Sequence, residues 1–405
     1  MIKVIAFDLV GVLVNEKDIR LSCTEKKLER LFGDNISDDI YLKDAEKIVK
    51  NKNDIIHITK NIIEKLYKIK EENLIRNLKK KYNNIKIIIA TNHVTFVKDY
   101  IKNNFKEVDD IIISAQINKI KPDKGFYKYI IDKYLISSEE LLFLDDNEKN
   151  ISSAKEIGIN TIYVKKDIAL YDEILKIINN DIEKNYYKAY ETRYKQIYQN
   201  NELWTEQKPT PDVIKTIDKI KLTKTSKILE IGCGEGRDAI SLLKKNYDVL
   251  AIDYSDTVIK KCNELSKQKY KKNFKQFDVI IDKLNEKFDF IYSVAVIHMF
   301  VNKDHRKKFL DFINDHLKEK GLALIASMGD GEKTYSSDIS KSFEITDRYI
   351  HNKTKVKIAT TSCKIVNWNQ FEKELENSNL RIKEKWISKE VPGFDKVMFV
   401  LIERN

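Results

Sequence analysis

The sequence predicts an α/β protein built from two doubly wound domains, each with a mostly parallel sheet covered by helices. Short apolar runs alternate with segments of helical periodicity in both halves of the chain. Polar or glycine-rich residues directly follow several of these runs, at the edge where α/β sheets bind their ligands. At 405 residues the chain is long enough for two domains with separate cores.

The N-terminal half predicts the first sheet, and we place this domain at residues 1–175. A polar segment rich in Lys and Glu, at about residues 15–81, carries Leu and Ile at helical intervals and predicts a small helical cap. The strand-like runs on either side of it are Val4–Phe7, Ile85–Ala90, Ile111–Ile113, Leu141–Leu144 and Thr161–Val164.

The C-terminal half, residues 176–405, begins with a helix rich in tyrosine. Its tyrosines lie on one helical face, and they either cover a ligand pocket or only pack against the domain. These residues are Tyr186, Tyr187, Tyr190, Tyr194 and Tyr198. Further strands are predicted at Phe288–Val294, Leu322–Ser327, Val356–Thr361 and Val397–Ile402.

Composition limits the classes of partner. Lys and Arg number 74 against 63 Asp and Glu, but the net charge of +11 is spread along helices, which argues against a nucleic-acid site. The four cysteines form no Cys-x-x-Cys pair, which favours a reducing compartment. With no leader segment and no apolar run near 18 residues, we expect a cytoplasmic protein without a membrane partner. The oligomeric state stays open.

The most informative motif is glycine-rich and follows the run at residues 227–231. Gly232, Gly234 and Gly236 lack Cβ atoms, so a ligand can approach the backbone closely. Asp253 ends the next predicted strand, where a carboxylate can accept hydrogen bonds from a ribose diol. This layout is typical of a nucleotide-binding βαβ unit.

The Gly-x-Gly-x-Gly spacing, with Glu230 two residues before the first glycine, resembles the first motif of class I S-adenosylmethionine (SAM)-dependent methyltransferases. The resemblance implies a seven-stranded sheet that ends in an antiparallel hairpin. It also implies that the glycine turn holds the methionine part of SAM, that Glu230 orients its amino group, and that Asp253 holds the ribose. Asp278 stands where the family places an acid that contacts the adenine amino group.

The sequence says less about the residues that would bind the methyl acceptor. Residues 288–298 resemble the fourth motif of the family, whose strand ends beside the transferred methyl group. His298 follows that strand and is a candidate general base, or it only shapes the pocket. The chain has no Asn-Pro-Pro-Tyr motif, and its layout from Trp204 onward resembles the small-molecule branch, including tellurite-resistance and thiopurine methyltransferases. We therefore expect a small-molecule acceptor with an O, N or S nucleophile.

In the first domain, four predicted strands deliver Asp8, Thr91, Lys121 and Asp146 to one sheet edge. A carboxylate can act as a nucleophile, and a hydroxyl and an ammonium can hold phosphoryl oxygens. A second acid can bind Mg²⁺. The set therefore predicts phosphoryl chemistry at this edge.

The four motifs resemble those of the haloacid dehalogenase (HAD) superfamily over about residues 1–170. The resemblance implies that Asp8 is the nucleophile, that Thr91 and Lys121 bind the phosphoryl group, and that Asp8 and Asp146 are magnesium ligands. Asn150 matches the second polar position of the fourth motif. The adjacent Asp145 has no assigned role.

One residue departs from the HAD pattern. Phosphatases of the family carry a general-acid Asp two positions after the nucleophile, and here that position is Val10. A positioned acid contributes roughly 10²- to 10⁴-fold, so its loss predicts poor hydrolysis of ordinary phosphate esters. Three alternatives remain: a weak or specialised phosphatase, carbon–halogen hydrolysis through Asp8, and a domain that keeps the fold with little or no turnover.

Overall fold

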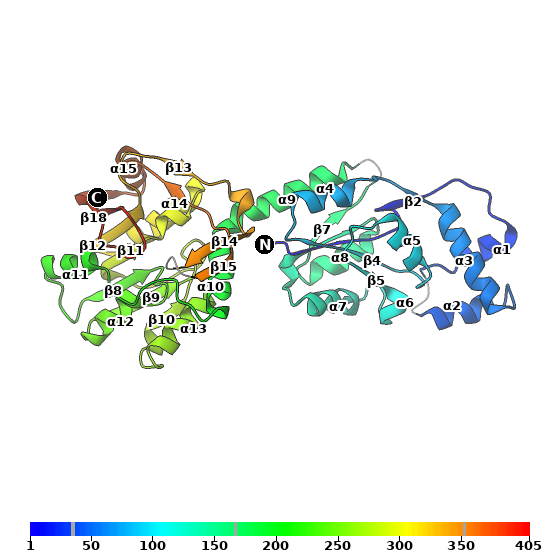
Figure 1. Ribbon diagram of the computed structural model, residues 1–405, viewed down its shortest axis with the longest axis horizontal. Helices are drawn as coiled ribbons and strands as arrows, with labels where there is room; N and C mark the ends of the chain where they lie inside the picture. Colours follow the sequence, from blue (N-terminus) through cyan, green and yellow to red (C-terminus); the bar gives the residue numbers. More distant parts are fainter. Residues whose placement is uncertain (34–36, 166–167, 351–353) are drawn as a thin grey trace. The chain divides into compact units, whose positions relative to one another are not determined.

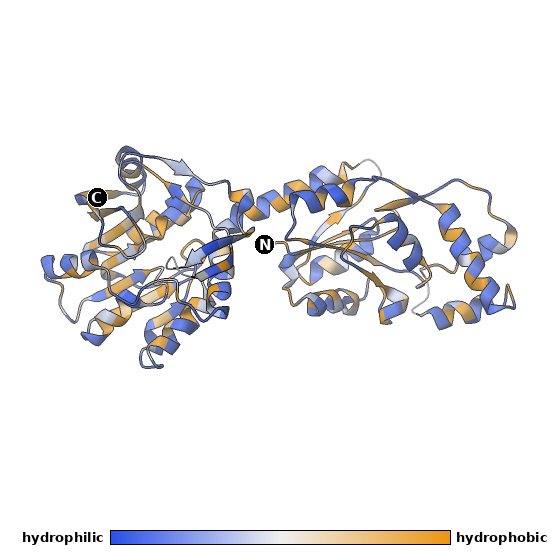
Figure 2. Cartoon of the chain, viewed as in Figure 1, coloured by the Kyte–Doolittle hydropathy of each residue, from blue (hydrophilic) through white to orange (hydrophobic). Residues whose placement is uncertain are grey.

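The computed structural model describes residues 1–33, 37–165, 168–350 and 354–405. It divides into two compact units, Met1–Asp181 and Ile182–Asn405. The division falls inside helix α9 (Leu170–Asn185), slightly later in the chain than the expected boundary after residue 175. Figure 1 shows the order of the elements, and Figure 2 shows apolar residues concentrated on the sheet strands of both units.

The first unit contains a five-stranded parallel sheet in the order β5-β4-β1-β6-β7. Every residue of β1 is buried, because helices cover both faces of the sheet, and this explains why its sequence is uniformly apolar. The strands are β1 (Val4–Phe7), β4 (Lys86–Thr91), β5 (Asp110–Ile113), β6 (Leu141–Asp145) and β7 (Asn160–Tyr163).

Helices α7 (Lys124–Tyr134) and α8 (Glu148–Glu156) pack on one face of this sheet, against residues such as Ala6 and Phe143. Helix α4 (Leu74–Lys81) lies beside α9 on the other side (Figure 1). The remaining helices of the core are α5 (Val97–Asn104) and the single turn α6 (Ser114–Ile117).

The cap is inserted between β1 and β4. Strands β2 (Val14–Glu16) and β3 (Tyr67–Ile69) pair antiparallel at its base. Between them lie the cap helices α1 (Cys23–Glu29), α2 (Asp38–Ala45) and α3 (Lys52–Leu66). The expected range of 15–81 was too long, because α4 belongs to the core: Arg76 pairs with Glu107, and Lys79 pairs with Asp109, beside β5.

The second unit contains a seven-stranded sheet in the order β10-β9-β8-β11-β12-β18-β17. The first five strands are parallel, and β18 runs antiparallel to both of its neighbours. The expected fold class is confirmed for both units. The strands are β8 (Lys227–Ile231), β9 (Asp248–Asp253), β10 (Phe274–Gln276), β11 (Phe288–Val294), β12 (Leu317–Met328), β17 (Leu380–Ser388) and β18 (Val397–Arg404).

Helices cover both faces of this sheet. Those that contribute to the core beneath β8 and β11 are α11 (Pro211–Lys219), α12 (Arg237–Lys244) and α13 (Asp256–Leu265). Figure 1 shows α14 (Lys303–His316) and α15 (Trp368–Glu376) on the opposite side. The tyrosine-rich stretch is interrupted by a 3₁₀ turn at Tyr186–Lys188, after which α10 (Ala189–Gln199) begins.

The final hairpin of the sheet differs from the prediction. The run near residues 356–361 does not join the sheet: it corresponds to β15 (Thr354–Ala359), which pairs only with β14 (Ile345–Ile350) and packs against α10. The partner of β18 is β17. This edge strand was missed because its sequence, Leu-Arg-Ile-Lys-Glu-Lys-Trp-Ile-Ser, is largely charged and exposed.

Across the part of the chain that the structure describes, none of the helices has both the length and the apolar character that crossing a bilayer requires.

Candidate functional site

The glycine motif forms a tight turn between β8 and α12. Gly232 has φ +71°, and its amide donates a hydrogen bond of 2.8 Å to the carbonyl of Ile252 on β9. A Cβ atom on Gly232 would overlap the side chain of Val296, in the loop after β11. The turn is therefore packed between β9 and that loop, and Gly232 is required both by its backbone angle and by the lack of space.

Asp253 lies directly beside this turn. One carboxylate oxygen accepts a hydrogen bond of 3.1 Å from the amide of Gly234, and the other accepts one of 3.0 Å from the amide of Ser255. Burial raises the pKa of Asp253 to about 6, although these two amides oppose the shift. The turn and the acid, which the sequence places at two strand ends, are adjacent in space.

The two other predicted cofactor ligands are also buried acids. Asp278, after β10, accepts a hydrogen bond of 2.7 Å from the hydroxyl of Tyr187. Glu230 is 4% exposed, and its Oε2 atom has no hydrogen-bond partner. Burial, with a contribution from Asp238, raises the pKa of Glu230 well above its usual range. A buried carboxylate oxygen without a partner fits an incoming ammonium group.

A covering segment, residues 186–205, contacts several parts of this site. Besides the bond from Tyr187 to Asp278, the carboxylate of Glu191 accepts hydrogen bonds from the hydroxyls of Ser255 and Thr257, just after β9. The prediction left open whether the tyrosine-rich helix covers the site or only packs beside it. These contacts show that it lies over the ends of β9 and β10.

The end of the covering segment is bound to the glycine turn. The backbone amides of Trp204 and Thr205 donate to the carboxylate of Glu235, at 2.6 and 2.9 Å. In consequence Asp253 and Asp278 are each only 8% exposed. A ligand that reaches these acids must displace part of the covering segment.

His298 lies in the 3₁₀ turn after β11, Ile297–Met299. It is buried, its Nδ1 atom has no hydrogen-bond partner, and its ring lies 6.0 Å from that of Phe394. Burial, assisted by the positive charge of Arg306, lowers the pKa of His298 to about 4. The imidazole is therefore neutral at physiological pH, although the lowered pKa makes it a weaker base than an ordinary histidine.

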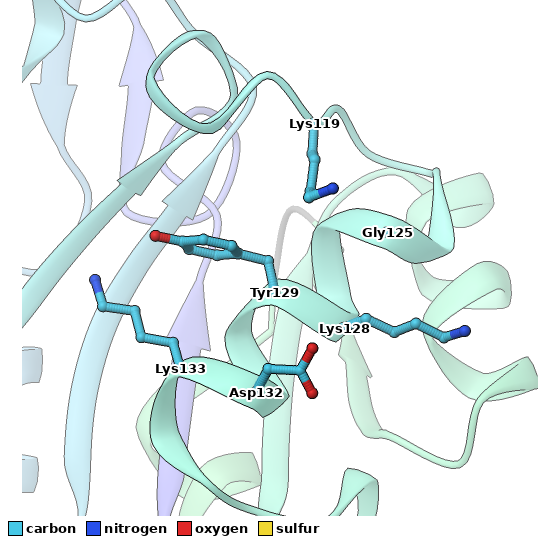
Figure 3. A pocket seen from close by; sticks show the side chains of 6 residues that line it. All are labelled: Lys119, Gly125, Lys128, Tyr129, Asp132 and Lys133. Carbon is cyan, nitrogen blue, oxygen red and sulfur yellow. The ribbon is translucent and has the colours of Figure 1, made fainter.

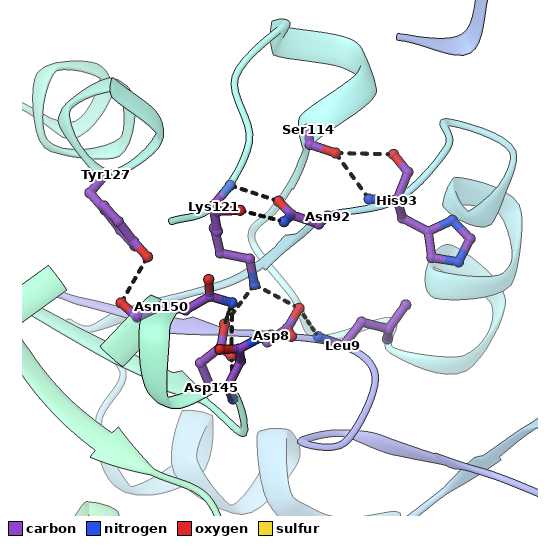
Figure 4. Close-up of polar contacts among 10 residues, drawn as sticks. Asp8, Leu9, Asn92, His93, Ser114, Lys121, Tyr127, Asp145 and Asn150 are labelled. Atoms are coloured by element: carbon purple, nitrogen blue, oxygen red, sulfur yellow. Dashed lines mark hydrogen bonds and ion pairs between the residues drawn. The ribbon is translucent and has the colours of Figure 1, made fainter. Parts of the chain in front are cut away.

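Of the predicted residues of the first unit, Asp8 and Lys121 meet at the carboxyl end of β1 (Figure 4). The ammonium of Lys121 lies 2.9 Å from a carboxylate oxygen of Asp8 and 2.7 Å from one of Asp145. The side-chain amide of Asn92 holds the backbone of Lys121 through two hydrogen bonds of 2.9 Å. Thr91 ends β4 and is buried.

Asp145, which had no assigned role, is central to this arrangement. It pairs with Lys121 and also accepts hydrogen bonds of 3.0 and 3.1 Å from the side-chain amide of Asn150. The carboxylates of Asp8, Asp145 and Asp146 each place an oxygen within 4.8 Å of the others, a donor set that fits a hard cation such as Mg²⁺. Sequence spacing alone could not show which of two adjacent acids faces inward.

The charge balance of this cluster depends on Lys121. Burial raises the pKa of Asp8 to about 6, and Lys121 is the strongest opposing influence. Burial disfavours the charge on Lys121 as well, but Asp8 and Asp145 raise its pKa overall. Gly11, with φ +81°, lets the chain pass against Asp146, since a Cβ at this position would overlap that carboxylate.

A separate open hollow lies along α7 and contains none of the predicted site residues (Figure 3). It is lined by Lys119, Gly125, Lys128, Tyr129, Asp132 and Lys133.

Comparison with known protein families matches the two units separately. Residues 5–164 match the model of haloacid dehalogenase-like hydrolases, and residues 193–383 match the model of the tellurite resistance protein TehB. The probable SAM-dependent methyltransferase TehB of Haemophilus influenzae is 30% identical over 113 residues, which cover 27% of this chain and 39% of that protein. Bifunctional epoxide hydrolase 2 of Rattus norvegicus is 33% identical over 69 residues, 17% of this chain and 12% of the relative.

This chain therefore spans less than half the length of these curated relatives. Among solved structures, a SAM-dependent methyltransferase from Clostridium acetobutylicum is 18% identical, with a TM-score of 0.39, and the match covers 52% of this chain and 96% of that one.

Removing the cation of the first cluster tests its electrostatics. We expect Lys121→Met to destabilise the first unit by roughly 3–5 kcal/mol at pH 7.5, because it leaves buried carboxylates uncompensated. The raised pKa of Asp8 means that its protonated form favours folding, so stability is lost as the pH rises through about 6, and the defect should shrink at pH 5. Hydrogen-exchange protection of β1 amides measures both effects. Lys119→Met, at an exposed lysine, is the control, and an equal effect at both pH values would contradict this account.

Proposed function

We propose that this chain, which joins a haloacid dehalogenase-like domain to a class I methyltransferase domain related to TehB, transfers a methyl group from SAM to a small-molecule nucleophile. The main support is the hydrogen bond between the Gly234 amide and Asp253, because a turn and an acid that touch can hold the two ends of one nucleoside. In this proposal Asp253 binds the ribose, Asp278 the adenine amino group, and Glu230 the amino group of the methionine part.

SAM, when bound, supplies an activated methyl group on a sulfonium. The protein's contribution is then to orient the acceptor and exclude water, which requires few reactive side chains. His298, buried and neutral, is placed after β11 to take a proton from an acidic hydroxyl or thiol. The covering segment excludes water once the cofactor is in place. A cytoplasmic setting, where SAM is made, is part of this proposal.

Cofactor binding is tested with calorimetry on S-adenosylhomocysteine. We expect Gly234→Val to weaken binding at least tenfold, since its side chain enters the space above the turn, where the backbone is left-handed at φ +52°. Asp253→Ala should weaken binding by a similar factor, because it removes the acceptor for the ribose hydroxyls. Gly158→Val, also at a left-handed glycine but in the first unit, is the matched control. Unaltered affinity in both site variants would remove the assignment.

The same affinity should depend on pH. Because the pKa of Asp253 is raised to about 6 by burial and by the neighbouring acids Glu191 and Asp278, the carboxylate is ionised only above that pH. The ionised form accepts the stronger hydrogen bonds, so we expect affinity for S-adenosylhomocysteine to fall as the pH drops from 7.5 to 5, by up to about tenfold per pH unit below the pKa. Calorimetry at several pH values measures this. In Asp253→Asn this decline in affinity near pH 6 should disappear. If the decline persists in that variant, a group other than Asp253 causes it.

A second candidate function belongs to the first unit. We propose that it is a magnesium-dependent phosphohydrolase restricted to esters with good leaving groups. Asp8 would attack the phosphorus atom, with Lys121, Thr91 and the metal neutralising the phosphoryl oxygens. The ion pair of Asp8 with Lys121 and the three converging carboxylates support this, whereas Val10 supplies no proton to the leaving group.

Phosphate release from two substrates tests this restriction. We expect magnesium-dependent turnover of 4-nitrophenyl phosphate, whose leaving group needs no proton, and little turnover of an alkyl phosphate. Asp8→Asn should abolish both activities. Val10→Asp should raise the rate on the alkyl ester by roughly 10²-fold while changing the aryl rate little. Failure to detect any turnover that depends on Asp8 would favour a domain that has kept the fold without the reaction.

A further inference from the structure

A buried guanidinium in the second unit lacks a carboxylate partner. Arg193, on α10, is only 4% exposed. Its Nε donates a hydrogen bond of 3.0 Å to the carbonyl of Ala359 on β15, but its Nη2 atom is buried without any hydrogen-bond partner. The guanidinium lies 5.4 Å from the ring centres of Tyr190 and Trp204. Cation–π contacts compensate only part of the cost of burying a charge.

The charges around Arg193 make its position more costly. Burial lowers the pKa of its guanidinium, and Arg348, a second cation on β14, lowers it further. The hydroxyls of Tyr190, Tyr194 and Tyr254 oppose this shift. A buried guanidinium with an unpaired donor, and with no carboxylate partner among the described residues, favours an anion from outside the chain.

A second unpaired polar atom lies nearby. The hydroxyl of Tyr190 donates to the carbonyl of Ser362 at 3.2 Å, and the hydroxyl of Ser362 donates to the carbonyl of Met299 at 2.6 Å. Met299 follows His298, whose Nδ1 atom has no partner. These hydrogen bonds therefore run from Tyr190, whose ring contacts the guanidinium of Arg193, to the backbone of Met299, the residue after His298.

We propose that the methyl acceptor carries a carboxylate and that Arg193 binds it; this inference rests on the methyltransferase function proposed above. Because Nε is committed to Ala359, the Nη1 and Nη2 end of the guanidinium remains, and it matches the two oxygens of a single carboxylate. A phosphate dianion would require more buried donors than this one end provides. The rings of Tyr190 and Trp204 suit an apolar, planar body for the acceptor.

The reaction then balances around His298. A hydroxyl or thiol of the acceptor gives its proton to Nδ1 of His298, and its oxygen or sulfur forms a bond to the methyl carbon. The bond between that carbon and the sulfonium sulfur breaks, and its electron pair stays on sulfur as S-adenosylhomocysteine. Trp204 is partly exposed and lies in an irregular stretch of the covering segment, so its displacement opens the way to Arg193.

Matched pairs of acceptors test this inference with the full chain. After saturation with S-adenosylhomocysteine, calorimetry compares 2-, 3- and 4-hydroxybenzoate with the corresponding hydroxybenzamides. We expect at least one acid to bind about ten- to a hundredfold more tightly than its amide, since the carboxylate makes charge-assisted hydrogen bonds. Arg193→Met should abolish this preference, and Arg193→Lys, which keeps the charge, should retain part of it. Lys357→Met removes an exposed positive charge from β15, the strand that contacts Arg193. This control variant should retain the full preference for the acid.

The outcomes separate this inference from the function on which it rests. Failure of the natural chain to bind S-adenosylhomocysteine overturns the methyltransferase assignment. Binding of S-adenosylhomocysteine without any preference for an acid over its amide, or without binding of any acid, overturns the carboxylate inference alone. Arg193→Met could instead weaken the binding of S-adenosylhomocysteine while the preference for acids persists. In that case the guanidinium binds the carboxylate of the cofactor, and the carboxylate inference for the acceptor is overturned. If that variant does not fold, Arg193→Lys and the natural chain decide.

Discussion

The second unit depends on the contact between the glycine turn and the acid at the end of β9. The amide of Gly234 donates to Asp253, and the amides of Gly232 and Cys233 both donate to the carbonyl of Ile252, so three hydrogen bonds tie the turn after β8 to the neighbouring strand. Val296 fills the space that a side chain on Gly232 would need. The loop after β11, which carries His298, is therefore positioned by the same turn. A substitution in the turn would disturb the proposed cofactor ligands and the proposed acceptor side together.

The covering segment closes this site. Tyr187 already donates to Asp278, and Glu235 already accepts from the backbone of residues 204 and 205. In the proposed function a nucleoside replaces these bonds, so opening the segment lowers the affinity below what the new contacts alone would give. In the proposed reaction the segment excludes water while the site orients the acceptor.

The sequence was most informative where chemistry and topology coincide. Acids and glycines that directly follow apolar runs were placed at strand ends, and the structure brings them together, because the carboxyl ends of parallel strands share one edge. It was least informative where a role depends on tertiary packing. Arg193 has no distinguishing neighbours in a helix of Lys, Glu and Tyr, and only its burial against β15 makes it exceptional. The edge strand β17 was missed because its charged residues face solvent.

Both sites contain buried acids, but in the described part of the chain only the acids of the first unit are paired with a buried cation. This difference indicates what each site can bind. In the first unit, Lys121 compensates Asp8 and Asp145, so an anionic phosphoryl group can approach once a metal ion adds further positive charge. In the second unit, burial raises the pKa values of Glu230 and Asp253, and within the described residues neither acid is held by an ion pair. Such acids ionise most readily when a cation arrives. A ligand that carries both an ammonium and a sulfonium would supply that charge, and its binding should therefore release a proton from Glu230, the acid assigned to the ammonium.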